Sequence, residues 1–562
     1  MEKIWLKHYP KGIPAEIDVT QYRSVVDVLE KACAKFSNGP AFINMGTTLT
    51  YAELDRHSKN FASYLRQVVG LKKGDRVAIQ MPNCLQYPVA LFGVLRAGCV
   101  VVNTNPLYTT REMEHQFKDS GCKAIVIVSN FAKQLEEVLP KTQIETVIVT
   151  DIGDCLKFPM NQVVNIVAKH VKKMVPEFNI PQAVPFTQAL RLGAARKYDA
   201  VDVGPEDMAF LQYTGGTTGV SKGAVLLNRN VVANMQQIFA WITPYLEEGK
   251  DLAIAPLPLY HIFCLTVNCM AMLSYGVCNI LITNPRDFPS FLKTMKKYPF
   301  TIMTGVNTLF NGLVNNAEFA KLDFSKFRIA VGGGMAVQKA VAQKWEKITG
   351  TRLIEGYGLT ESSPVLTVNP LDGNDQIGTI GIPVPSTDIK LVNGNGEEVA
   401  IGERGEICGK GPQLMAGYWQ QPAETAKVIR DGWLHTGDIG VMGADGFIKI
   451  VDRIKDMILV SGFNVYPNEI EDVLATHPGI LEVAAIGIAD EKSGEVVKVF
   501  IVPKDPGLTV EAVKEFCKAQ FTGYKRPKYI EFRTELPKTN VGKILRRALK
   551  EEAVKDGPRL GQ

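Results

Sequence analysis

Short apolar runs alternate with stretches of helical periodicity between residues 100 and 150. Residues 100–102, 124–128 and 146–149 are almost wholly apolar, as in strands that are buried on both faces. Between them, residues 110–120 and 131–139 repeat apolar side chains at helical spacing. This alternation predicts an α/β fold, in which helices cover both faces of a parallel sheet.

The alternation extends in both directions along the chain. Upstream, the pattern predicts a hairpin, a further strand and three helices, at residues 41–44 with 48–50, 77–81, and 25–36, 51–69 and 86–96. Downstream, strands expected at 301–303, 328–331 and 353–354 run into segments that contain glycine. Ligands of open α/β sheets gather beyond the carboxyl ends of the strands, so we expect these strand ends to converge on one site.

Residues 252–285 contain no Asp, Glu, Lys or Arg. A transmembrane helix needs about 20 consecutive apolar residues, but prolines, a histidine and asparagines interrupt this run. A strand at 252–257, a buried helix at 262–274 and a strand at 277–282 fit the pattern better than a membrane span.

The pattern changes after residue 378. Residues 378–450 read as short strands joined by Gly, Pro, Asn and Asp turns, which predicts a β-rich subdomain. A compact α+β piece follows Arg453, with helices expected at 468–476, 510–520 and 544–551 and strands at 483–488 and 496–502. The predicted organisation is therefore a large domain, 1–452, of α/β subdomains with a β-rich subdomain, followed by a small mobile α+β lid, 453–562.

Composition narrows the class of protein. The chain has 562 residues, of which 46% are hydrophobic and 22% charged, so it can bury a large core. A net charge of +5 without a basic stripe interleaved with aromatic residues argues against nucleic acid as a partner. Ten scattered cysteines form no Cys-x-x-Cys pair, which suits free thiols in a reducing cytoplasm. The N-terminus lacks the apolar core of a signal peptide, so a cytoplasmic location is expected.

The strongest chemical signal is the stretch at residues 213–223, Tyr-Thr-Gly-Gly-Thr-Thr-Gly-Val-Ser-Lys-Gly, which lies between two apolar runs. Its glycines let backbone N–H groups converge, and its hydroxyls and lysine add donors and positive charge, as in an anion-binding nest. It differs from a Walker A loop, because its lysine precedes the last glycine and no Ser or Thr follows. A polar surface loop is the alternative. We assign phosphate binding to Tyr213, Thr214, Gly215, Gly216, Thr217, Thr218, Gly219 and Lys222.

Residues 161–175 form an amphipathic pattern with a basic side. Apolar side chains gather on one helical side, and Lys169, His170, Lys172 and Lys173 lie largely elsewhere. A basic amphipathic helix can lie on an anionic bilayer. A surface helix that docks on the core is the alternative, and the pattern favours it.

Five motifs in this order resemble the adenylate-forming superfamily of acyl-CoA ligases, luciferases and peptide-synthetase adenylation domains. They are the loop 213–223, Tyr357-Gly358-Leu359-Thr360-Glu361, Thr436-Gly437-Asp438, Asp452-Arg453 and Pro537-Lys538-Thr539-Asn540-Val541-Gly542-Lys543. Residues 431–457 also resemble the fatty-acyl-CoA synthetase signature, and the whole chain resembles the bacterial long-chain fatty-acid–CoA ligases that prime β-oxidation. The resemblance implies that ATP and a fatty acid form an acyl-adenylate and pyrophosphate, and that coenzyme A then displaces AMP.

The resemblance also implies roles for the residues of these motifs. Tyr357 is expected to stack on adenine, although a core aromatic is the alternative. Glu361, with Thr214, is expected to bind Mg²⁺, a hard cation that prefers oxygen ligands. Asp438 is expected to bind the ribose with Arg453 nearby, and Arg453 could equally form a domain-interface salt bridge. We place Gly333, Gly334, Gly358 and Thr360 with these residues as cofactor-binding.

Three further positions follow from the same resemblance. Lys543 is expected against the substrate carboxylate and the α-phosphate, whereas the residue pattern by itself indicates an exposed lysine. His261 matches an active-site position of the family, and a satisfied core histidine is the alternative. Lys455 matches the hinge about which the lid rotates, carrying Lys543 away and bringing the segment around Gly462 toward the coenzyme A channel.

Other functions stay open at this point. A medium-chain or aryl-acid CoA ligase would carry the same motifs, because the sequence does not give the depth of the acid pocket. A non-catalytic nucleotide- or acyl-binding protein at the membrane is a third interpretation, against which the intact motif set argues. Contact with the inner face of the membrane and the oligomeric state are not fixed by the sequence.

Overall fold

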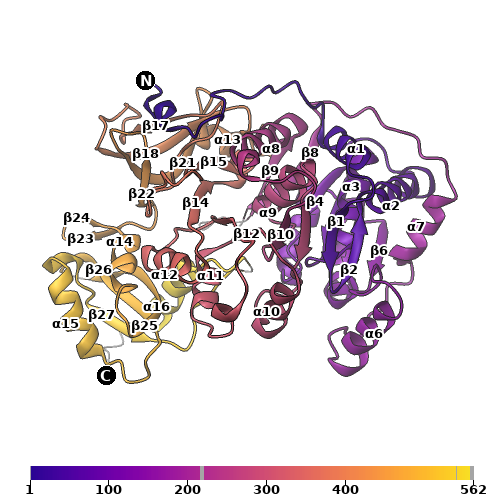
Figure 1. Cartoon of the computed structure of the whole chain (residues 1–562). Coiled ribbons are helices and arrows are strands. Elements are labelled where there is room, and N and C mark those ends of the chain that lie inside the picture. The colour runs from indigo at the N-terminus through magenta and orange to yellow at the C-terminus, as the bar shows by residue number, and fades with distance from the viewer. Residues whose placement is uncertain (1, 215–220, 491, 540, 557–562) are drawn as a thin grey trace.

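The computed structural model describes residues 2–214, 221–490, 492–539 and 541–556. A large part built on two α/β sheets fills the right and centre of Figure 1. A β-rich sheet lies at the upper left of that view, and the small C-terminal domain lies below it. This architecture confirms the predicted fold class.

The first sheet has eight strands in the order β19-β9-β8-β4-β3-β5-β6-β7. Strands β3 to β8 pair in parallel, and β8, β9 and β19 pair antiparallel. The strands are β3 (Arg76–Gln80), β4 (Val100–Asn103), β5 (Ala124–Val128), β6 (Thr146–Thr150), β7 (Val184–Pro185), β8 (Met208–Thr214), β9 (Lys222–Leu227) and β19 (Gly417–Tyr418).

Helices cover both faces of this sheet, as the alternation predicts. Val126 of β5 belongs to one hydrophobic core and its neighbours Ile125 and Ile127 belong to another, because successive strand residues face opposite sides. The helices around this sheet are α2 (Tyr51–Ser63), α3 (Gln86–Arg96), α4 (Thr110–Ser120), α5 (Ala132–Val138) and α7 (Phe186–Ala194). All eleven residues of α3 are buried, which explains why its sequence is apolar on most sides.

The second sheet has nine strands in the order β16-β15-β14-β13-β12-β10-β11-β1-β2. Its central strands are parallel, and both edges are antiparallel. The strands are β1 (Pro40–Asn44), β2 (Thr47–Thr50), β10 (Leu252–Ala255), β11 (Cys278–Leu281), β12 (Ile302–Gly305), β13 (Ile329–Gly332), β14 (Leu353–Gly358), β15 (Val365–Val368) and β16 (Ile382–Pro383). Its helices include α1 (Val25–Lys35), α8 (Asn228–Ile242), α10 (Phe288–Lys297), α11 (Asn307–Val314) and α12 (Lys339–Thr349).

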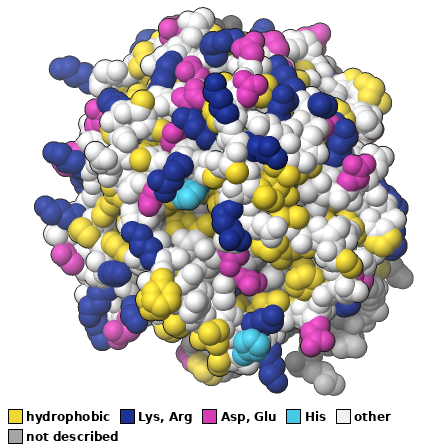
Figure 2. Space-filling model, turned by 90° about the vertical axis from the view of Figure 1, so that its right-hand side faces the viewer, with side chains coloured by type: hydrophobic (Ala, Val, Ile, Leu, Met, Phe, Trp, Pro, Cys, Tyr) yellow, Lys and Arg dark blue, Asp and Glu magenta, His cyan; other side chains and the backbone are white. Residues whose placement is uncertain are grey.

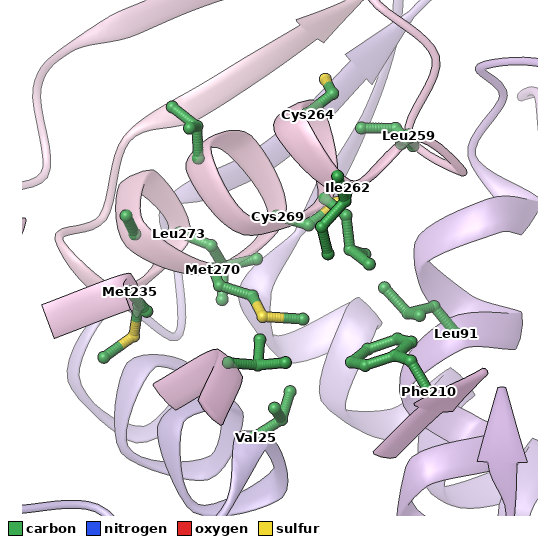
Figure 3. Packing of buried hydrophobic residues seen from close by; sticks show 14 of the residues in the cluster. Val25, Leu91, Phe210, Met235, Leu259, Ile262, Cys264, Cys269, Met270 and Leu273 are labelled. Carbon is green, nitrogen blue, oxygen red and sulfur yellow. The ribbon is translucent and has the colours of Figure 1, made fainter. Parts of the chain in front are cut away.

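The uncharged segment 252–285 lies inside the protein, as predicted. Strand β10 leads to α9 (Ile262–Thr266), which continues as a π-helix (Val267–Met272) before β11. Figure 3 shows Cys269 and Met270 of this segment packed near Val25, Leu91 and Phe210, which come from other elements. Within the described residues, every helix is too short or too polar to cross a bilayer.

The β-rich region forms a five-stranded antiparallel sheet, which confirms the change of pattern after residue 378. Its strands are β17 (Asp388–Val392), β18 (Arg404–Lys410), β20 (Ile429–Arg430), β21 (Trp433–Met442) and β22 (Ile448–Arg453), with the short helix α13 (Pro422–Val428) beside them. Strand β22 ends at Arg453, so the last residues of this sheet adjoin the turn that leads to the small domain.

The small domain has its own five-stranded sheet and hydrophobic core. Its elements are β23 (Ile458–Val460), β24 (Phe463–Val465), α14 (Pro467–Leu474), β25 (Ile480–Asp490), β26 (Gly494–Pro503), α15 (Val510–Gln520), β27 (Tyr529–Phe532) and α16 (Arg546–Asp556). The last helix begins two residues later than expected, because Ile544 instead forms a bridge with Lys538. The boundary at 452/453 stays a prediction.

Candidate active site

The carboxyl ends of β12, β13 and β14 lie close together, as the strand pattern predicts. The Gly333 N–H donates to the carbonyl of Gly305 at 3.2 Å, which ties the end of β13 to the end of β12. A Cβ on Gly358 would lie 1.8 Å from the carbonyl oxygen of Pro364, so only glycine fits where β14 meets β15. Gly334 has a φ of +76°, a conformation that glycine adopts without strain.

Tyr357, Asp438 and Arg453 form one cluster beside these strand ends. Antiparallel pairing of β21 with β22 places Asp438 opposite Arg453, and Arg453 Nε lies 3.0 Å from Asp438 Oδ1. The Tyr357 hydroxyl donates to Asp438 Oδ2 at 2.6 Å. Burial, and then the charge of Asp438, raise the pKa of Tyr357 well above its usual value, so this hydroxyl stays protonated. The predicted trio is brought together, and the salt bridge of Arg453 lies within the β-rich sheet, between β21 and β22.

A second cluster surrounds the base of the glycine-rich loop. Strands β8 and β9 pair Thr214 with Lys222, and Lys222 forms an ion pair with Glu424. The Lys222 ammonium lies 5.2 Å from the centre of the Tyr418 ring, and the Tyr418 hydroxyl donates to Glu361 Oε1 at 2.7 Å. Glu361 lies in the short 3₁₀ helix Thr360–Ser362. Tyr418 links it to Lys222 at the base of the glycine-rich loop, the region where it is predicted to bind Mg²⁺ with Thr214.

The loop itself is only partly described. The predicted strands on both sides of it are confirmed by β8 and β9. Five of the assigned phosphate-binding residues lie outside the described residues, namely Gly215, Gly216, Thr217, Thr218 and Gly219.

Tyr213 occupies a different environment from its loop neighbours. Its ring is buried in the core beside α4, and its hydroxyl donates to Asp119 Oδ2 at 2.5 Å. A Cβ on Gly223 would lie 3.1 Å from this ring, so the ring packs directly on the opposite strand. The Tyr213 side chain therefore anchors the loop, and only its backbone adjoins the predicted phosphate site.

Lys543 reaches this region from the small domain. The Thr308 hydroxyl, at the start of α11, donates to the carbonyl of Gly542 at 2.8 Å, which joins the two domains beside the strand ends. The Lys543 N–H donates to Thr539 Oγ1 at 3.0 Å and holds the tight turn. Burial, and then the charge of Arg453, lower the pKa of Lys543 to about 7. The half-buried ammonium thus lies within electrostatic reach of the Tyr357–Asp438–Arg453 cluster.

His261 adjoins the same region from the N-terminus of α9. Its Nδ1 accepts the N–H of Phe263 at 3.3 Å, so the ring caps this helix. Burial, and then the charge of Lys543, lower the pKa of His261 to about 4, so the ring is neutral at physiological pH. The histidine thus caps this helix within electrostatic reach of Lys543, and its role in the active site stays a prediction.

Lys455 and Gly462 lie at different distances from this assembly. Burial of the Lys455 ammonium, and then the charge of Arg453, lower the pKa of Lys455. Lys455 therefore lies near the cluster. Gly462 has a φ of +84° in an exposed turn between β23 and β24, next to Phe463. Figure 1 shows these strands at the far edge of the small domain, apart from β12 and β14. In this conformation, the structure does not bring Gly462 to the other site residues.

Sequence reasoning missed three residues that complete the arrangement. Tyr418 binds Glu361, Glu424 pairs with Lys222, and Thr308 holds the Lys543 turn. Each is far from its partner in sequence and lies in no motif of recognisable chemistry, so a single sequence carries no signal for these contacts. The strand predicted at 301–303 runs into the segment that contains Thr308, which is the nearest that the pattern comes to this residue.

Comparison with known proteins agrees with this geometry. A long-chain-fatty-acid–CoA ligase of Escherichia coli O6:H1 is 57% identical over 553 residues, which are 98% of this chain and 99% of that protein. The ligase of the same name from Haemophilus influenzae is 52% identical over the full length of both chains. Among solved structures, an anthranilate CoA ligase in complex with anthranoyl-AMP matches with a TM-score of 0.86 at 25% identity, over 96% of this chain and 99% of that one.

A second solved structure and two family models also match the chain. A fatty acyl CoA synthetase of Mycobacterium tuberculosis matches with a TM-score of 0.71 at 27% identity, over 95% of this chain and 99% of that one. The model of the AMP-binding enzymes matches residues 29–419, and that of the AMP-binding enzyme C-terminal domain matches residues 469–543. The chain therefore belongs to the family of AMP-binding enzymes.

Proposed function

We propose that the protein is a long-chain fatty-acid–CoA ligase that feeds fatty-acid β-oxidation. It joins a fatty acid and ATP into acyl-adenylate and pyrophosphate, and coenzyme A then displaces AMP to give acyl-CoA. The names of relatives more than 50% identical over the whole chain support the substrate class. The observation that carries the proposal is the position of Lys543, docked beside the Tyr357–Asp438–Arg453 cluster at the strand ends.

The first half-reaction requires that negative charge be neutralised and that the reactants be aligned. A carboxylate is a poor acyl donor, and its attack on the α-phosphate brings two anions together. The Lys543 ammonium offsets this charge where the new bond forms, because a fixed positive group costs no reorganisation during the reaction. The neutral His261 adds no further charge beside it.

The nucleotide is held by the two clusters around the strand ends. Residues 214–222 bind the β- and γ-phosphates, with Lys222 beside them. The Tyr357 hydroxyl is bound to Asp438, which fixes the ring. The face of the ring stacks on adenine. Asp438 accepts the ribose hydroxyls while Arg453 holds its carboxylate in place. Gly333 and Gly334 let the backbone approach the nucleotide closely, and Gly358 and Thr360 lie beside it in the same motif as Tyr357.

Glu361 fits the role of a Mg²⁺ ligand. Its carboxylate is partly exposed, and Tyr418 orients it by binding Oε1. Thr214, at the end of β8, would supply a hydroxyl oxygen, and both are the hard oxygen ligands that Mg²⁺ prefers. When bound, Mg²⁺ would neutralise the charge of the phosphates. Tyr418 would keep the carboxylate turned toward the base of the loop.

The second half-reaction requires a different position of the small domain. We propose that the part of the chain after Lys455 rotates about this residue after pyrophosphate leaves. The motion would carry Lys543 away and bring the turn at Gly462 toward the coenzyme A channel. The support is that Lys455 lies in the turn between β22 and β23, where the chain passes from one sheet to the next.

The variant Lys543→Ala tests this assignment, because the two half-reactions can be measured separately. Adenylate formation from ATP and oleate should fall about 10²–10³-fold, as when other charge stabilisers are lost. Thioester formation from supplied oleoyl-adenylate should stay near the wild-type rate. Equal loss in both assays would refute the rotating-lid assignment, while leaving open that the protein is a ligase.

The acid specificity is tested by the rate of AMP release, dependent on ATP and coenzyme A, across acids of increasing chain length. We expect the ratio kcat/KM to be highest for long-chain acids. A sharp maximum at short or aromatic acids would overturn the long-chain assignment in favour of a medium-chain or aryl-acid ligase. A complete lack of pyrophosphate release with ATP and oleate would instead indicate a non-catalytic binding protein.

We also propose that the protein contacts the inner face of the membrane through residues 158–174. Helix α6 (Met160–Ile166) and the π-helical turn that follows it (Val167–Val171) carry the amphipathic pattern. The sequence pattern favours a helix that docks on the core. In the structure, however, several apolar side chains of this segment are exposed. They include Phe158, Ile166, Val171 and Met174, which are 77%, 55%, 69% and 53% exposed.

The charge of this segment suits an anionic lipid surface. Lys169, Lys172 and Lys173 are exposed among the apolar side chains. Figure 2 looks onto the side of the molecule that carries α6 and α7 in Figure 1, and groups of hydrophobic side chains alternate there with lysine and arginine. Exposed apolar side chains that alternate with basic ones are typical of a surface that inserts shallowly at an anionic bilayer.

Co-sedimentation with vesicles that contain anionic lipid tests this proposal. Reversal of Lys169, Lys172 and Lys173 to Glu should lower binding, since each basic residue contributes about 1 kcal/mol near such a surface. The control reverses three exposed lysines elsewhere, Lys11, Lys514 and Lys518, and so changes the net charge equally. Equal loss in both variants would show a nonspecific charge effect, and no loss in either would count against this surface.

A further inference from the structure

Three side chains of different chemistry converge in the β-rich sheet. Glu406 and Cys408 lie on β18, and His435 lies on β21 directly opposite Cys408. His435 Nδ1 is 2.8 Å from Glu406 Oε2 and 3.4 Å from Cys408 Sγ. One ligand atom from each residue lies within 4.8 Å of the other two.

The contacts of His435 Nδ1 exclude a cysteine nucleophile that is activated by histidine. In a cysteine nucleophile activated by histidine, the acid and the thiol contact different nitrogens of the ring, so that a proton can pass between them. Here the carboxylate and the thiol both contact Nδ1, which can hold only one proton. The three groups therefore point to one place in space, as the ligands of a metal ion do.

The spacing suits a tetrahedral zinc ion. Bonds of about 2.0 Å to nitrogen and oxygen and about 2.3 Å to sulfur place neighbouring ligand atoms about 3.3–3.7 Å apart. The observed separations of 2.8 Å and 3.4 Å need only small side-chain movements to reach this geometry. Zinc accepts thiolate, imidazole and carboxylate ligands, whereas Mg²⁺ prefers oxygen ligands.

Solvent access at the group suits an exchangeable ion. The side chains of His435 and Glu406 are 11% and 19% exposed, so water can reach a fourth coordination position. A metal ion that binds Cys408 must displace the proton of its thiol. The positive groups of Lys390 and Arg430 act on the same thiol and oppose a cation.

We propose that Glu406, Cys408 and His435 bind one Zn²⁺ ion, with water as the fourth ligand. The inference is independent of the proposed ligase activity. The site is nevertheless joined to the nucleotide cluster, because Glu406 Oε1 also accepts the N–H of Gly437 at 3.0 Å. Gly437 immediately precedes Asp438 on β21. The Glu406 carboxylate that binds the ion therefore also holds the backbone just before Asp438.

Titration of the full-length protein with Zn²⁺ and with Co²⁺ tests the proposal. Co²⁺ takes the place of Zn²⁺ and gives a near-ultraviolet thiolate-to-metal charge-transfer band only if sulfur is a ligand. We expect one equivalent of Zn²⁺ per chain and this band in the wild type. In Cys408→Ser the band should disappear and the affinity for Zn²⁺ should fall at least about tenfold, since even loss of a partner of a ligand costs 10–100-fold.

Two further variants make the result decisive. Cys155→Ser removes a partly buried thiol outside the group and should leave both the band and the affinity unchanged. Glu406→Gln keeps the size of the side chain and should weaken Zn²⁺ binding while retaining the band, which covers the case in which Cys408→Ser fails to fold. Absence of the band from the wild type, or equal affinity in the wild type, Cys408→Ser and Glu406→Gln, would overturn the proposal.

Discussion

At the scale of single residues, the charge of Lys543 depends on what occupies the site. Without a bound anion, burial and the neighbouring Arg453 lower its pKa to about 7. The ammonium of the free enzyme is therefore present below pH 7 and is lost as the pH rises through that value. Bound phosphates act in the opposite direction, because a nearby negative charge favours the protonated form.

This dependence predicts a pH profile for adenylate formation. For ATP, the value of kcat/KM reports the free enzyme and should fall above pH 7, approaching about tenfold per pH unit. The value of kcat, at saturating ATP, should fall only at higher pH. Lys543→Arg should be less active but flat between pH 7 and 9, because a guanidinium stays protonated. The same fall of kcat/KM in Lys543→Arg would assign the titration to another group.

Asp438 is the residue on which the nucleotide cluster depends. Asp438→Asn removes the charge that Arg453 and the Tyr357 hydroxyl both contact. Hydrogen bonds to charged groups contribute about 1.5–3 kcal/mol, so the KM for ATP should rise about 10–100-fold. Steady-state kinetics measures this change. Asp431→Asn, at an exposed position just before β21, is the matched control and should behave like the wild type. A KM for ATP that is unchanged in Asp438→Asn would contradict the assignment.

At the scale of elements, the junction of β14 with β15 sets the geometry of the site. Gly358 pairs with Val365, and the short helix that carries Glu361 begins two residues later. In Gly358→Ala the added methyl carbon would lie 1.8 Å from the carbonyl oxygen of Pro364, so the two atoms would overlap. The strands must separate locally, and Tyr357 and Glu361 move with them.

Gly358→Ala should therefore lower both stability and ATP binding. Overpacking of this kind costs about 1–3 kcal/mol, measured as the free energy of unfolding in urea. Gly394→Ala adds the same methyl group in an open turn, where no atom lies within 4 Å of the new carbon. That control should change neither quantity. Wild-type behaviour of Gly358→Ala would show that the β14–β15 junction can shift without affecting the site.

The elements also show how far a single sequence reaches. Helices at 86–96, 110–120 and 510–520 and the strand at 124–128 occur at the predicted residues, because each depends on a local apolar pattern. The division of the strands between two sheets was not predicted, since pairing between distant segments leaves no local signal. For the same reason, the motifs predicted Glu361 and Lys543, but the partners Tyr418 and Thr308 appeared only in the fold.

At the scale of the whole molecule, Arg546 connects the last helix to the junction between the domains. Its Nη2 lies 2.6 Å from Glu471 Oε2, and its Nη1 lies 3.9 Å from Asp452 Oδ1 at the end of β22. Asp452 is fully buried, and burial raises its pKa to about 6 despite the guanidinium. Without Arg546, two buried carboxyl groups would lose their shared cation.

Arg546→Met should consequently destabilise the protein by about 3–5 kcal/mol, as when one partner of a buried ion pair is removed. Arg547→Met is the matched control on the same helix, since Arg547 is exposed and pairs with Glu551 one turn away. It should cost less than about 0.5 kcal/mol. Urea denaturation of both variants measures the difference, and similar losses would show that the junction does not depend on Arg546.

The crowding of positive groups around Lys543 has a consequence for the order of the reaction. Arg453, and then Arg546 and Lys455, act on this lysine against the opposite charge of Asp438, so a polyanion that lies beside Lys543 should strengthen the docked position of the small domain. Departure of pyrophosphate removes most of that negative charge and with it this added stabilisation. On the proposed rotation of the small domain, the product that leaves first would then time the motion, and coenzyme A would be admitted only after the adenylate has formed. The chain would need no separate sensor to prevent the thiol from arriving too early.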